Sequence, residues 1–277
     1  MIIDAHQHFW NYSPQKHSWI NSDMGILKKD FLPSDLLETY KENGVSGCVA
    51  VQAEQSEEET LFLLQLAEDY DFIKGVVGWL DLRSPDLEDR IKYFRQFKKL
   101  KGLRHVVQDE PDPNFLLDPD FQKGLGLLEK YELTYDLLVY PHQLNAAIQT
   151  VENFPNLKFV LDHIAKPPIK DQVIAPWEDA IGIIGSKKNA YCKISGMVTE
   201  ASWTSWKVDD FVPYLDTVFR AFGIDRIMFG SDWPVCLLAG NYAQVLGLVK
   251  NYSSRLNVEE KNKLFYENAA SFYGLRQ

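Results

Sequence analysis

The residues with the clearest capacity for chemistry are two histidines near the start of the chain, His6 and His8, in the stretch MIIDAHQHFW. They follow an apolar strand start, and side chains at positions i and i+2 of a strand point to one face, about 6.5–7 Å apart along the chain. Two imidazoles placed in this way can bind a single cation. The alternative is that the two histidines only cap a strand with ordinary hydrogen bonds, and the pair by itself does not distinguish these possibilities.

Two further motifs could complete a metal site. His163 lies in LDHIAKP and Asp232 lies in FGSDWPV. If the fold brings them opposite the first pair, three imidazoles and one carboxylate would form a ligand set suited to a divalent cation. The sequence therefore predicts that His6, His8, His163 and Asp232 converge on one point.

The elements that must position these residues follow a regular alternation. Eight short apolar segments have the character of strands, at 2–6, 45–52, 73–82, 100–107, 134–140, 158–164, 190–196 and 226–232. Amphipathic segments with apolar residues at three- and four-residue spacing lie between them and predict helices, for example at 34–43, 57–70, 86–100, 118–131 and 141–154. Near-continuous apolar strands that alternate with helices indicate a parallel sheet covered by helices.

Eight such units in 277 residues favour one (β/α)8 TIM barrel over residues 1–277, since a doubly wound sheet more often stops at five or six strands. In such a barrel the active site lies at the carboxyl ends of the strands, among the loops that follow them. Five of the six histidines fall at predicted strand ends, and only His17, in the first long loop, does not. This regularity indicates a shared site.

The motifs DAHQHFW, LRH at 103–105, LDHIAKP and FGSDWPV together resemble the amidohydrolase superfamily, in particular its sugar-lactone hydrolases. The resemblance implies a barrel hydrolase that acts on aldonolactones such as L-fucono- or L-rhamnono-lactone. It also implies a metal site made of His6, His8, His163 and Asp232. One divalent metal is expected there, in the first place Zn²⁺, although some related lactonases hold the metal weakly or work without one.

One departure from the family pattern concerns the fourth strand. Binuclear members of the superfamily carry a carboxylated lysine at its end, whereas this chain has Arg104 and His105 there. A site with two metals is therefore not expected.

Lactone hydrolysis requires a nucleophilic water, a base that takes its proton, and positive charge near the carbonyl oxygen. In a one-metal version Asp232 accepts the proton and returns it to the ring oxygen, while His105 or His163 assists. In a metal-poor version His163, His105 and Arg104 stabilise the oxyanion and Asp232 alone activates water. We predict Asp232, His163 and His105 as catalytic residues, and no GxSxG motif supports an acyl-enzyme route through serine.

Several other polar or aromatic residues are candidates for substrate binding. Arg104 could hold a lactone oxygen through its fork of donors, or it could pair with Asp81 or Asp136. Glu54 could accept a hydroxyl or ligate the metal, or it could instead cap the helix that begins near Ser56. The further candidates, each with core packing or solvent exposure as its alternative, are Tyr140, Lys166, Trp10 and Trp233.

Composition narrows the kind of partner. The formal charge of -10 argues against nucleic acid or an anionic membrane surface, because either would be repelled. The three cysteines are widely spaced and lack a CxxC pair, which favours reduced thiols in a cytoplasm. No apolar run reaches the roughly 18 residues of a membrane span, and no secretory signal precedes the first strand. We expect a cytoplasmic enzyme with a small sugar lactone as its partner, in a chain that could form a homodimer.

Other functions remain open at this point. The same fold could carry a metal-dependent decarboxylase or a dicarboxylate lactonase, although among the arginines only Arg104 lies at a predicted strand end. A non-catalytic sugar-binding barrel is a second alternative, and histidines that hold a structural ion are a third.

Overall fold

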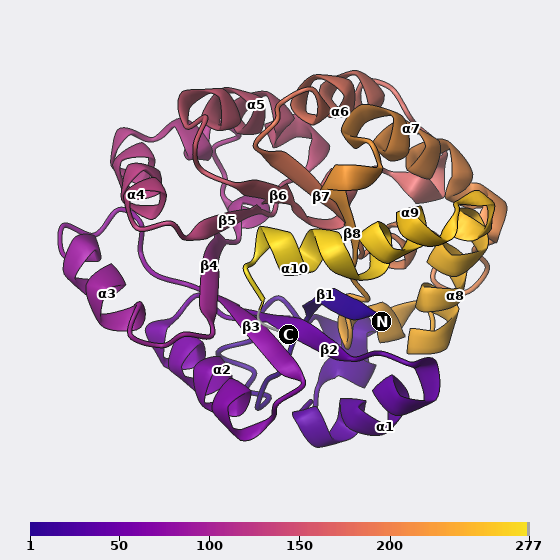
Figure 1. Ribbon diagram of the computed structural model, residues 1–277, viewed down its shortest axis with the longest axis horizontal. Coiled ribbons are helices and arrows are strands. Elements are labelled where there is room, and N and C mark those ends of the chain that lie inside the picture. The colour runs from indigo at the N-terminus through magenta and orange to yellow at the C-terminus, as the bar shows by residue number, and fades with distance from the viewer. Residues whose placement is uncertain (276–277) are drawn as a thin grey trace.

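The computed structural model describes residues 1–275, and its centre is a parallel sheet of eight strands in the order β1 to β8 (Figure 1). The strands are β1 (Ile3–Gln7), β2 (Gly47–Val51), β3 (Ile73–Gly78), β4 (Leu100–His105), β5 (Thr134–Leu137), β6 (Phe159–Leu161), β7 (Ala190–Ile194) and β8 (Ile227–Phe229). Almost all of their residues are buried, as expected for parallel strands that are covered on both faces. The predicted (β/α)8 TIM barrel is confirmed.

The sheet closes between its first and last strands. The backbone N–H of Asp232 donates to the carbonyl oxygen of His6 over 2.8 Å, and the N–H of His8 donates to the carbonyl oxygen of Trp233 over 2.7 Å. Gln7 and Trp233 form a parallel bridge beside these bonds. The closure of the barrel therefore lies at the strand ends that carry predicted site residues.

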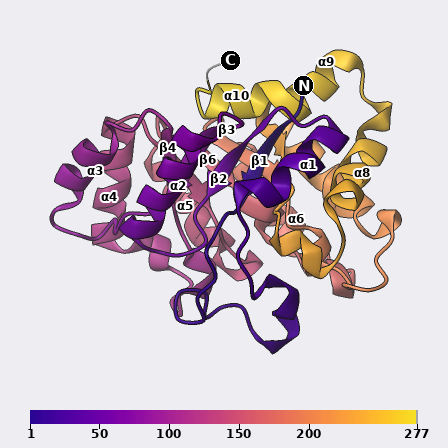
Figure 2. The ribbon, with the colours of Figure 1, turned by 90° about the horizontal axis from the view of Figure 1, so that it is seen from below.

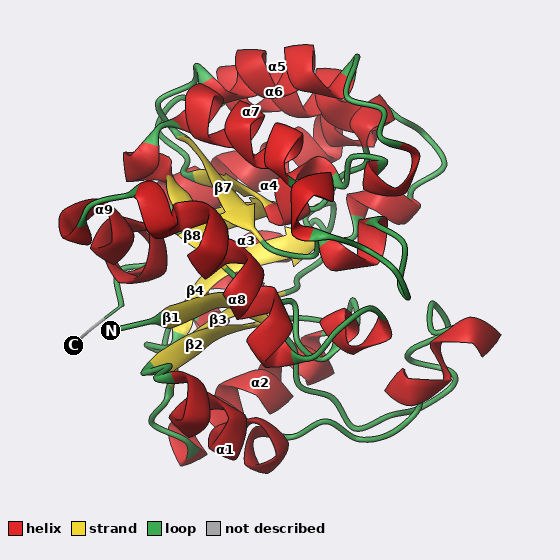
Figure 3. Ribbon diagram, turned by 90° about the vertical axis from the view of Figure 1, so that its right-hand side faces the viewer, coloured by secondary structure: helices red, strands yellow, loops and turns green. Residues whose placement is uncertain are grey.

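Helices surround the strands as an outer layer, which Figures 1 and 3 show from two directions. They are α1 (Pro33–Asn43), α2 (Glu57–Asp69), α3 (Leu87–Phe94), α4 (Pro119–Lys130), α5 (Leu144–Asn153), α6 (Trp177–Gly185), α7 (Val212–Phe222) and α8 (Tyr242–Tyr252). Their apolar faces pack on the barrel in one extended core. None of the helices within residues 1–275 has the length and apolar character that a membrane span requires.

The C-terminal segment crosses one end of the barrel (Figures 1 and 2). It consists of α9 (Val258–Asn262), a π-helical turn (Lys263–Glu267) and α10 (Asn268–Phe272). Phe272 and Tyr273 pack against the inward-facing side chains of the strands, including Val49, Val77 and Met228. This segment seals the end of the barrel at which both termini lie, and the long loop after β1 projects from the opposite end (Figure 2).

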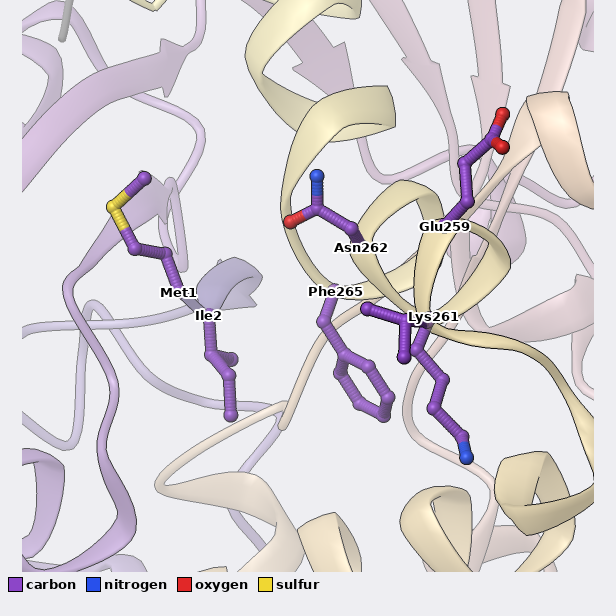
Figure 4. A pocket seen from close by; sticks show the side chains of 7 residues that line it. Met1, Ile2, Glu259, Lys261, Asn262 and Phe265 are labelled. Carbon is purple, nitrogen blue, oxygen red and sulfur yellow. The ribbon is translucent and has the colours of Figure 1, made fainter.

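A shallow pocket of about 550 Å³ opens at this sealed end, between the start of the chain and α9 (Figure 4). Its lining is mostly apolar and includes Met1, Ile2 and Phe265. It lies away from the strand ends that carry the histidines, so it is not the predicted site.

Several predicted element boundaries were wrong, and the strands predicted at 134–140, 158–164 and 226–232 end three residues early, at Leu137, Leu161 and Phe229. The strand predicted at 73–82 ends at Gly78, where Thr60 Oγ1 accepts the N–H of Trp79 over 2.8 Å in place of a strand partner. The helix predicted at 86–100 ends at Phe94, since the chain turns at residues 95–99 to enter β4. Local apolar spacing does not indicate these turns.

Candidate active site

His6 and His8 direct their Nε2 atoms toward the same position. His8 Nδ1 lies 2.8 Å from the carbonyl oxygen of Val51, which can only accept, so Nδ1 carries the proton. His6 Nδ1 lies 3.2 Å from Asp162 Oδ1. The two Nε2 atoms face each other at 3.2 Å. His8 Nε2 therefore has a lone pair available for a cation, and His6 Nε2 would offer one with its ring proton on Nδ1 beside Asp162.

His163 and Asp232 reach the same point from unusual backbone conformations. Their φ angles are +53° and +58°, in the left-handed region that costs L-residues free energy. Left-handed φ values continue without interruption from His163 to Lys166. Strain of this kind persists only where the surrounding structure enforces it, and it concentrates at functional sites.

Two glycines allow the imidazoles to approach the barrel backbone. A Cβ atom at Gly196, whose φ is +60°, would lie 2.4 Å from His163 Nδ1, and one at Gly230 would lie 2.7 Å from the Cβ of His6. The space opened at Gly196 lets His163 Nδ1 pair with Ser195 Oγ at 2.9 Å. His163 Nε2 is then directed at Asp232.

The predicted convergence of the four side chains is confirmed. Asp232 Oδ1 lies 3.3 Å from His8 Nε2, 3.9 Å from His6 Nε2 and 3.9 Å from His163 Nε2. A tetrahedral zinc ion with bonds of about 2.0–2.1 Å separates its ligand atoms by about 3.3 Å. His6, His8 and Asp232 place their ligand atoms within 4.8 Å of one another, which fits a divalent cation, and His163 lies 3.9 Å from Asp232 as the further ligand. The ligand role of the four residues stays a prediction.

Burial governs the protonation of this group. It holds the pKa values of His6 and His163 well below their usual range, and so keeps both imidazoles neutral, as metal ligation requires. Burial would also raise the pKa of Asp232, but the neighbouring His163 and His8 rings outweigh it and the pKa is lowered. Asp232 is therefore an ionised carboxylate beside the neutral rings of His6 and His163, and a cation would compensate its charge.

A second cluster lies directly behind His6. Arg104 was predicted from the sequence as a site residue, whereas Asp136, Asp162 and Lys193 were not. Asp162 Oδ2 pairs with Arg104 Nη1 at 3.1 Å, and Asp162 Oδ1 pairs with Lys193 Nζ at 3.0 Å. Asp136 Oδ2 lies 2.5 Å from the same ammonium. The signal that could have revealed this cluster is the presence of charged residues inside otherwise apolar strands, as in TYDLL and AYCKI.

Arg104 has neither of the carboxylate partners considered for it. Its guanidinium pairs with Asp162 and donates to the backbone carbonyl and the side-chain oxygen of Gln52. Asp81 lies near Arg83 instead, and Asp136 pairs with Lys193. Because Nη1 also lies 3.3 Å from His6 Nε2, Arg104 borders the candidate metal site, although its terminal nitrogens are engaged by the protein.

His105 is buried at the end of β4 but contacts other groups. Its Nδ1 accepts from the indole N–H of Trp79 at 3.3 Å, so its Nε2 carries the proton that Glu110 accepts at 2.7 Å. Its ring stacks on Phe115. These contacts hold His105 against Trp79 and the loop after β4 rather than against Asp232. The catalytic role of His105 stays a prediction.

Two lysine–glutamate pairs involve the predicted substrate-binding residues. Lys166 Nζ lies 2.8 Å from Glu200 Oε1 and 5.7 Å from the centre of the Tyr140 ring. Lys16 Nζ lies 3.1 Å from Glu54 Oε2. Lys16 and Glu200 were not predicted from the sequence. Glu54 does not cap α2, because Ser56 Oγ accepts the helical N–H of Glu59.

The two tryptophans predicted to stack on a sugar are nearly enclosed. Trp10 is 1% exposed, and its indole N–H donates to the carbonyl oxygen of Lys29 at 2.9 Å. Trp233 is 5% exposed and packs edge-on against Phe9 and Phe31. Both rings pack within the protein, which leaves them little free surface for a ligand.

Comparison with known proteins assigns this arrangement to one family. The chain matches the amidohydrolase family from residue 3 to residue 275, and it belongs to that family. The protein is therefore a hydrolase.

Two similar proteins, both named L-fucono-1,5-lactonase, align with nearly the whole chain. An L-fucono-1,5-lactonase from Burkholderia multivorans is 40% identical over 284 residues, covering 99% of this chain and 96% of that protein. One from Burkholderia ambifaria is 34% identical over 98% of this chain and 94% of its own length. A crystal structure of an amidohydrolase from Burkholderia multivorans with bound zinc has a TM-score of 0.96, with 39% identity and full coverage of both chains.

Proposed function

We propose that the protein hydrolyses a sugar-acid lactone to the aldonic acid, with L-fucono-1,5-lactone as the first candidate and L-rhamnono-lactone as the second. The observation that carries this proposal is the group of three imidazoles around the Asp232 carboxylate, with Nε2–Oδ1 distances of 3.3–3.9 Å. Relatives that are named L-fucono-1,5-lactonases, at 40% and 34% identity, support the choice of substrate.

Asp232 is the proposed base. Its ionised carboxylate would take a proton from the attacking water and return it to the ring oxygen as the carbon–oxygen bond breaks. A divalent cation held by His6, His8, His163 and Asp232 would supply positive charge that polarises the carbonyl and eases ionisation of the water. Arg104, fixed beside His6 Nε2, adds a permanent positive charge near the developing oxyanion.

Substrate binding is proposed for Glu54, Tyr140 and Lys166. Each charged member of this set has a partner of opposite sign, Lys16 for Glu54 and Glu200 for Lys166. Such pairs offer hydrogen-bond donors and acceptors with little net charge, which suits a neutral polyhydroxylated ring better than a dicarboxylate. This charge balance favours the sugar lactone over the dicarboxylate alternative.

We propose zinc as the metal, since a similar solved structure at 39% identity contains it. A reducing compartment is supported by Cys48, Cys192 and Cys236, which are all buried and free of disulfides. A cytoplasmic location and a homodimer stay predictions.

The direct test is a panel of aldonolactones monitored with a pH indicator. We expect acid release from L-fucono-1,5-lactone with the wild-type protein, and slower release from lactones of different stereochemistry. Asp232→Asn is the matched control, because it keeps the shape of the side chain and removes its basicity. Absence of acid release across the panel would contradict the proposal, and carbon dioxide release from an aromatic acid would favour a decarboxylase.

A further inference from the structure

Lys193 on β7 is a fully buried lysine that the proposed chemistry does not use. Its ammonium lies 2.5 Å from Asp136 Oδ2, 3.0 Å from Asp162 Oδ1 and 3.1 Å from His6 Nδ1. Lysine is almost never fully buried unless it is paired. Here Lys193 joins the buried carboxylates of Asp136 and Asp162 to the Nδ1 side of His6, a candidate metal ligand.

Asp162 is held on both of its oxygens. Oδ2 pairs with Arg104 and Oδ1 pairs with Lys193, so the carboxylate cannot rotate without losing an ion pair. In this orientation Oδ1 lies 3.2 Å from His6 Nδ1. Arg104 can only donate, and its Nη1 lies 3.3 Å from His6 Nε2. The Lys193 ammonium, at 3.1 Å from Nδ1, can also only donate, so Asp162 Oδ1 is the acceptor that can hold a proton on Nδ1 and leave the lone pair on Nε2.

Lys193 is itself held from the far end of the barrel. Asp136 accepts the hydroxyl proton of Tyr273, whose oxygen lies 2.9 and 3.1 Å from the two carboxylate oxygens. Tyr273 directly follows α10, so a contact chain runs from the C-terminal segment through Asp136, Lys193 and Asp162 to His6. The side chains that pack around Tyr273 at this end of the barrel are apolar, among them Val77 and Met228.

Stability alone does not account for these buried charges. The interior of a (β/α)8 barrel is usually filled by branched apolar side chains. Replacing a buried ion pair by apolar residues of similar volume is often neutral or stabilising. A cluster that ends on a ring nitrogen of a candidate ligand instead has the arrangement of a carboxylate–histidine–metal contact, in which the carboxylate orients the ring.

We propose that Lys193 is a positioning residue, which fixes Asp162 and thereby holds His6 with Nδ1 protonated and Nε2 directed at the metal position. The inference rests on the proposed metal site, and it deepens that site without changing the reaction.

The test uses the double variant Lys193→Met/Asp136→Asn, which removes one charge of each sign, so that neither is left buried without a partner. In the metal-free wild-type protein, ¹⁵N NMR should show a protected Nδ1–H on His6. In the variant this resonance should broaden or disappear, since Asp162 Oδ1 is free to turn away. The zinc affinity, measured by competition with a chromophoric chelator, should fall about 10- to 100-fold, the usual effect of losing such a partner.

Asn268→Ala is the structural control, because Asn268 lies in α10 and its side-chain amide donates to the carbonyl oxygens of Ile224 and Ile227. It should lower the melting temperature and leave the His6 resonance and zinc affinity unchanged. Tyr273→Phe is the second variant should the double variant not fold, and it should shift both readouts by a smaller factor. An unchanged His6 resonance together with wild-type zinc affinity, in whichever variant folds, would overturn the inference.

The two proposals can fail separately. A wild-type protein that binds no zinc would contradict the proposed metal site, whereas loss of the His6 resonance in the variant would still support the positioning role. A wild-type protein without a protected Nδ1–H on His6 would overturn the positioning role, whatever its activity on lactones.

Discussion

The backbone N–H of Asp232 donates to the carbonyl oxygen of His6 over 2.8 Å, so one of the hydrogen bonds that close the barrel joins two of the candidate metal ligands. Asp4 reinforces this junction, because its Oδ1 accepts the N–H of His6 at 3.2 Å and the N–H of Ser231 at 2.8 Å. The separation of these ligands therefore depends on closure of the barrel, and the site forms only when the fold is complete.

Asp232→Asn should abolish most lactone hydrolysis while the fold stays intact. Loss of a general base typically slows a reaction by about 10²–10⁴-fold. The measurement is turnover on the best lactone of the panel, together with a melting curve. If added divalent cation restores much of the activity, Asp232 acts as a ligand rather than a base, and near wild-type turnover would remove it from the mechanism.

Removal of the metal should lower both activity and stability. A ligand that binds only the folded state raises the free energy of unfolding, by about 2.7 kcal/mol at a free concentration 100-fold above its Kd. Dialysis against a chelator should therefore lower the melting temperature, and added zinc should restore it. The same melting temperature with and without zinc would argue against a bound metal.

Gly196→Ala should displace His163. The new Cβ would lie 2.4 Å from His163 Nδ1, at a backbone φ of +60° that disfavours any side chain. We expect loss of zinc affinity and of turnover, with a lower melting temperature. Gly182→Ala is the control, because its Cβ would meet no atom within 4 Å inside α6. That change should be neutral or slightly stabilising, and equal effects of the two substitutions would refute the steric explanation.

Lys166→Met should weaken substrate binding more than it slows the chemical step. The Lys166 side chain is 15% exposed, and its ammonium lies beside Glu200 and the Tyr140 ring. KM for the sugar lactone should rise while kcat changes less. Lys170→Met, an exposed lysine of the same loop, should leave both constants unchanged. A fall in kcat at constant KM would instead place Lys166 in the chemical step.

Glu59 should make stability depend on pH. Burial raises the pKa of its carboxyl group to about 7. The hydrogen bonds from the N–H groups of Ala53 and Glu54 and the nearby Lys16 ammonium lower the pKa, but burial outweighs them. Because the folded pKa lies above the unfolded value of about 4.5, the folded state binds more protons. The contribution of this group is therefore fully present below pH 4.5 and is lost as the pH rises through about 7.

Glu59→Gln tests this dependence, since the amide oxygen can still accept both N–H groups and no longer titrates. Between pH 4.5 and 8 the wild-type protein should lose up to about 3 kcal/mol more free energy of unfolding than the variant, because each tenfold difference in proton affinity corresponds to about 1.4 kcal/mol. Denaturant unfolding at several pH values gives the comparison. Parallel pH profiles for the two proteins would contradict the raised pKa.

The sequence alone was sufficient to predict the barrel and the converging group. Apolar runs that alternate with amphipathic segments specify strands and helices through local spacing, and eight repeats define the architecture. His6, His8, His163 and Asp232 were predictable because each lies at or directly beyond a strand end, and the strand ends of a barrel meet at one face. The left-handed conformations at His163 and Asp232 were not predictable, because neither residue type signals them.

Only the tertiary structure decided which buried charges meet inside the barrel. Arg104, Asp136, Asp162 and Lys193 come from or directly follow four different strands, and no spacing along the chain indicates which of these side chains turn inward at the same level. The pairing of Arg104 with Asp81 or Asp136, considered as an alternative to substrate binding, was wrong for this reason, since Arg104 pairs with Asp162 and Asp136 pairs with Lys193. Strand periodicity determines which face a side chain occupies, whereas the stagger of the strands around the closed barrel determines what it contacts.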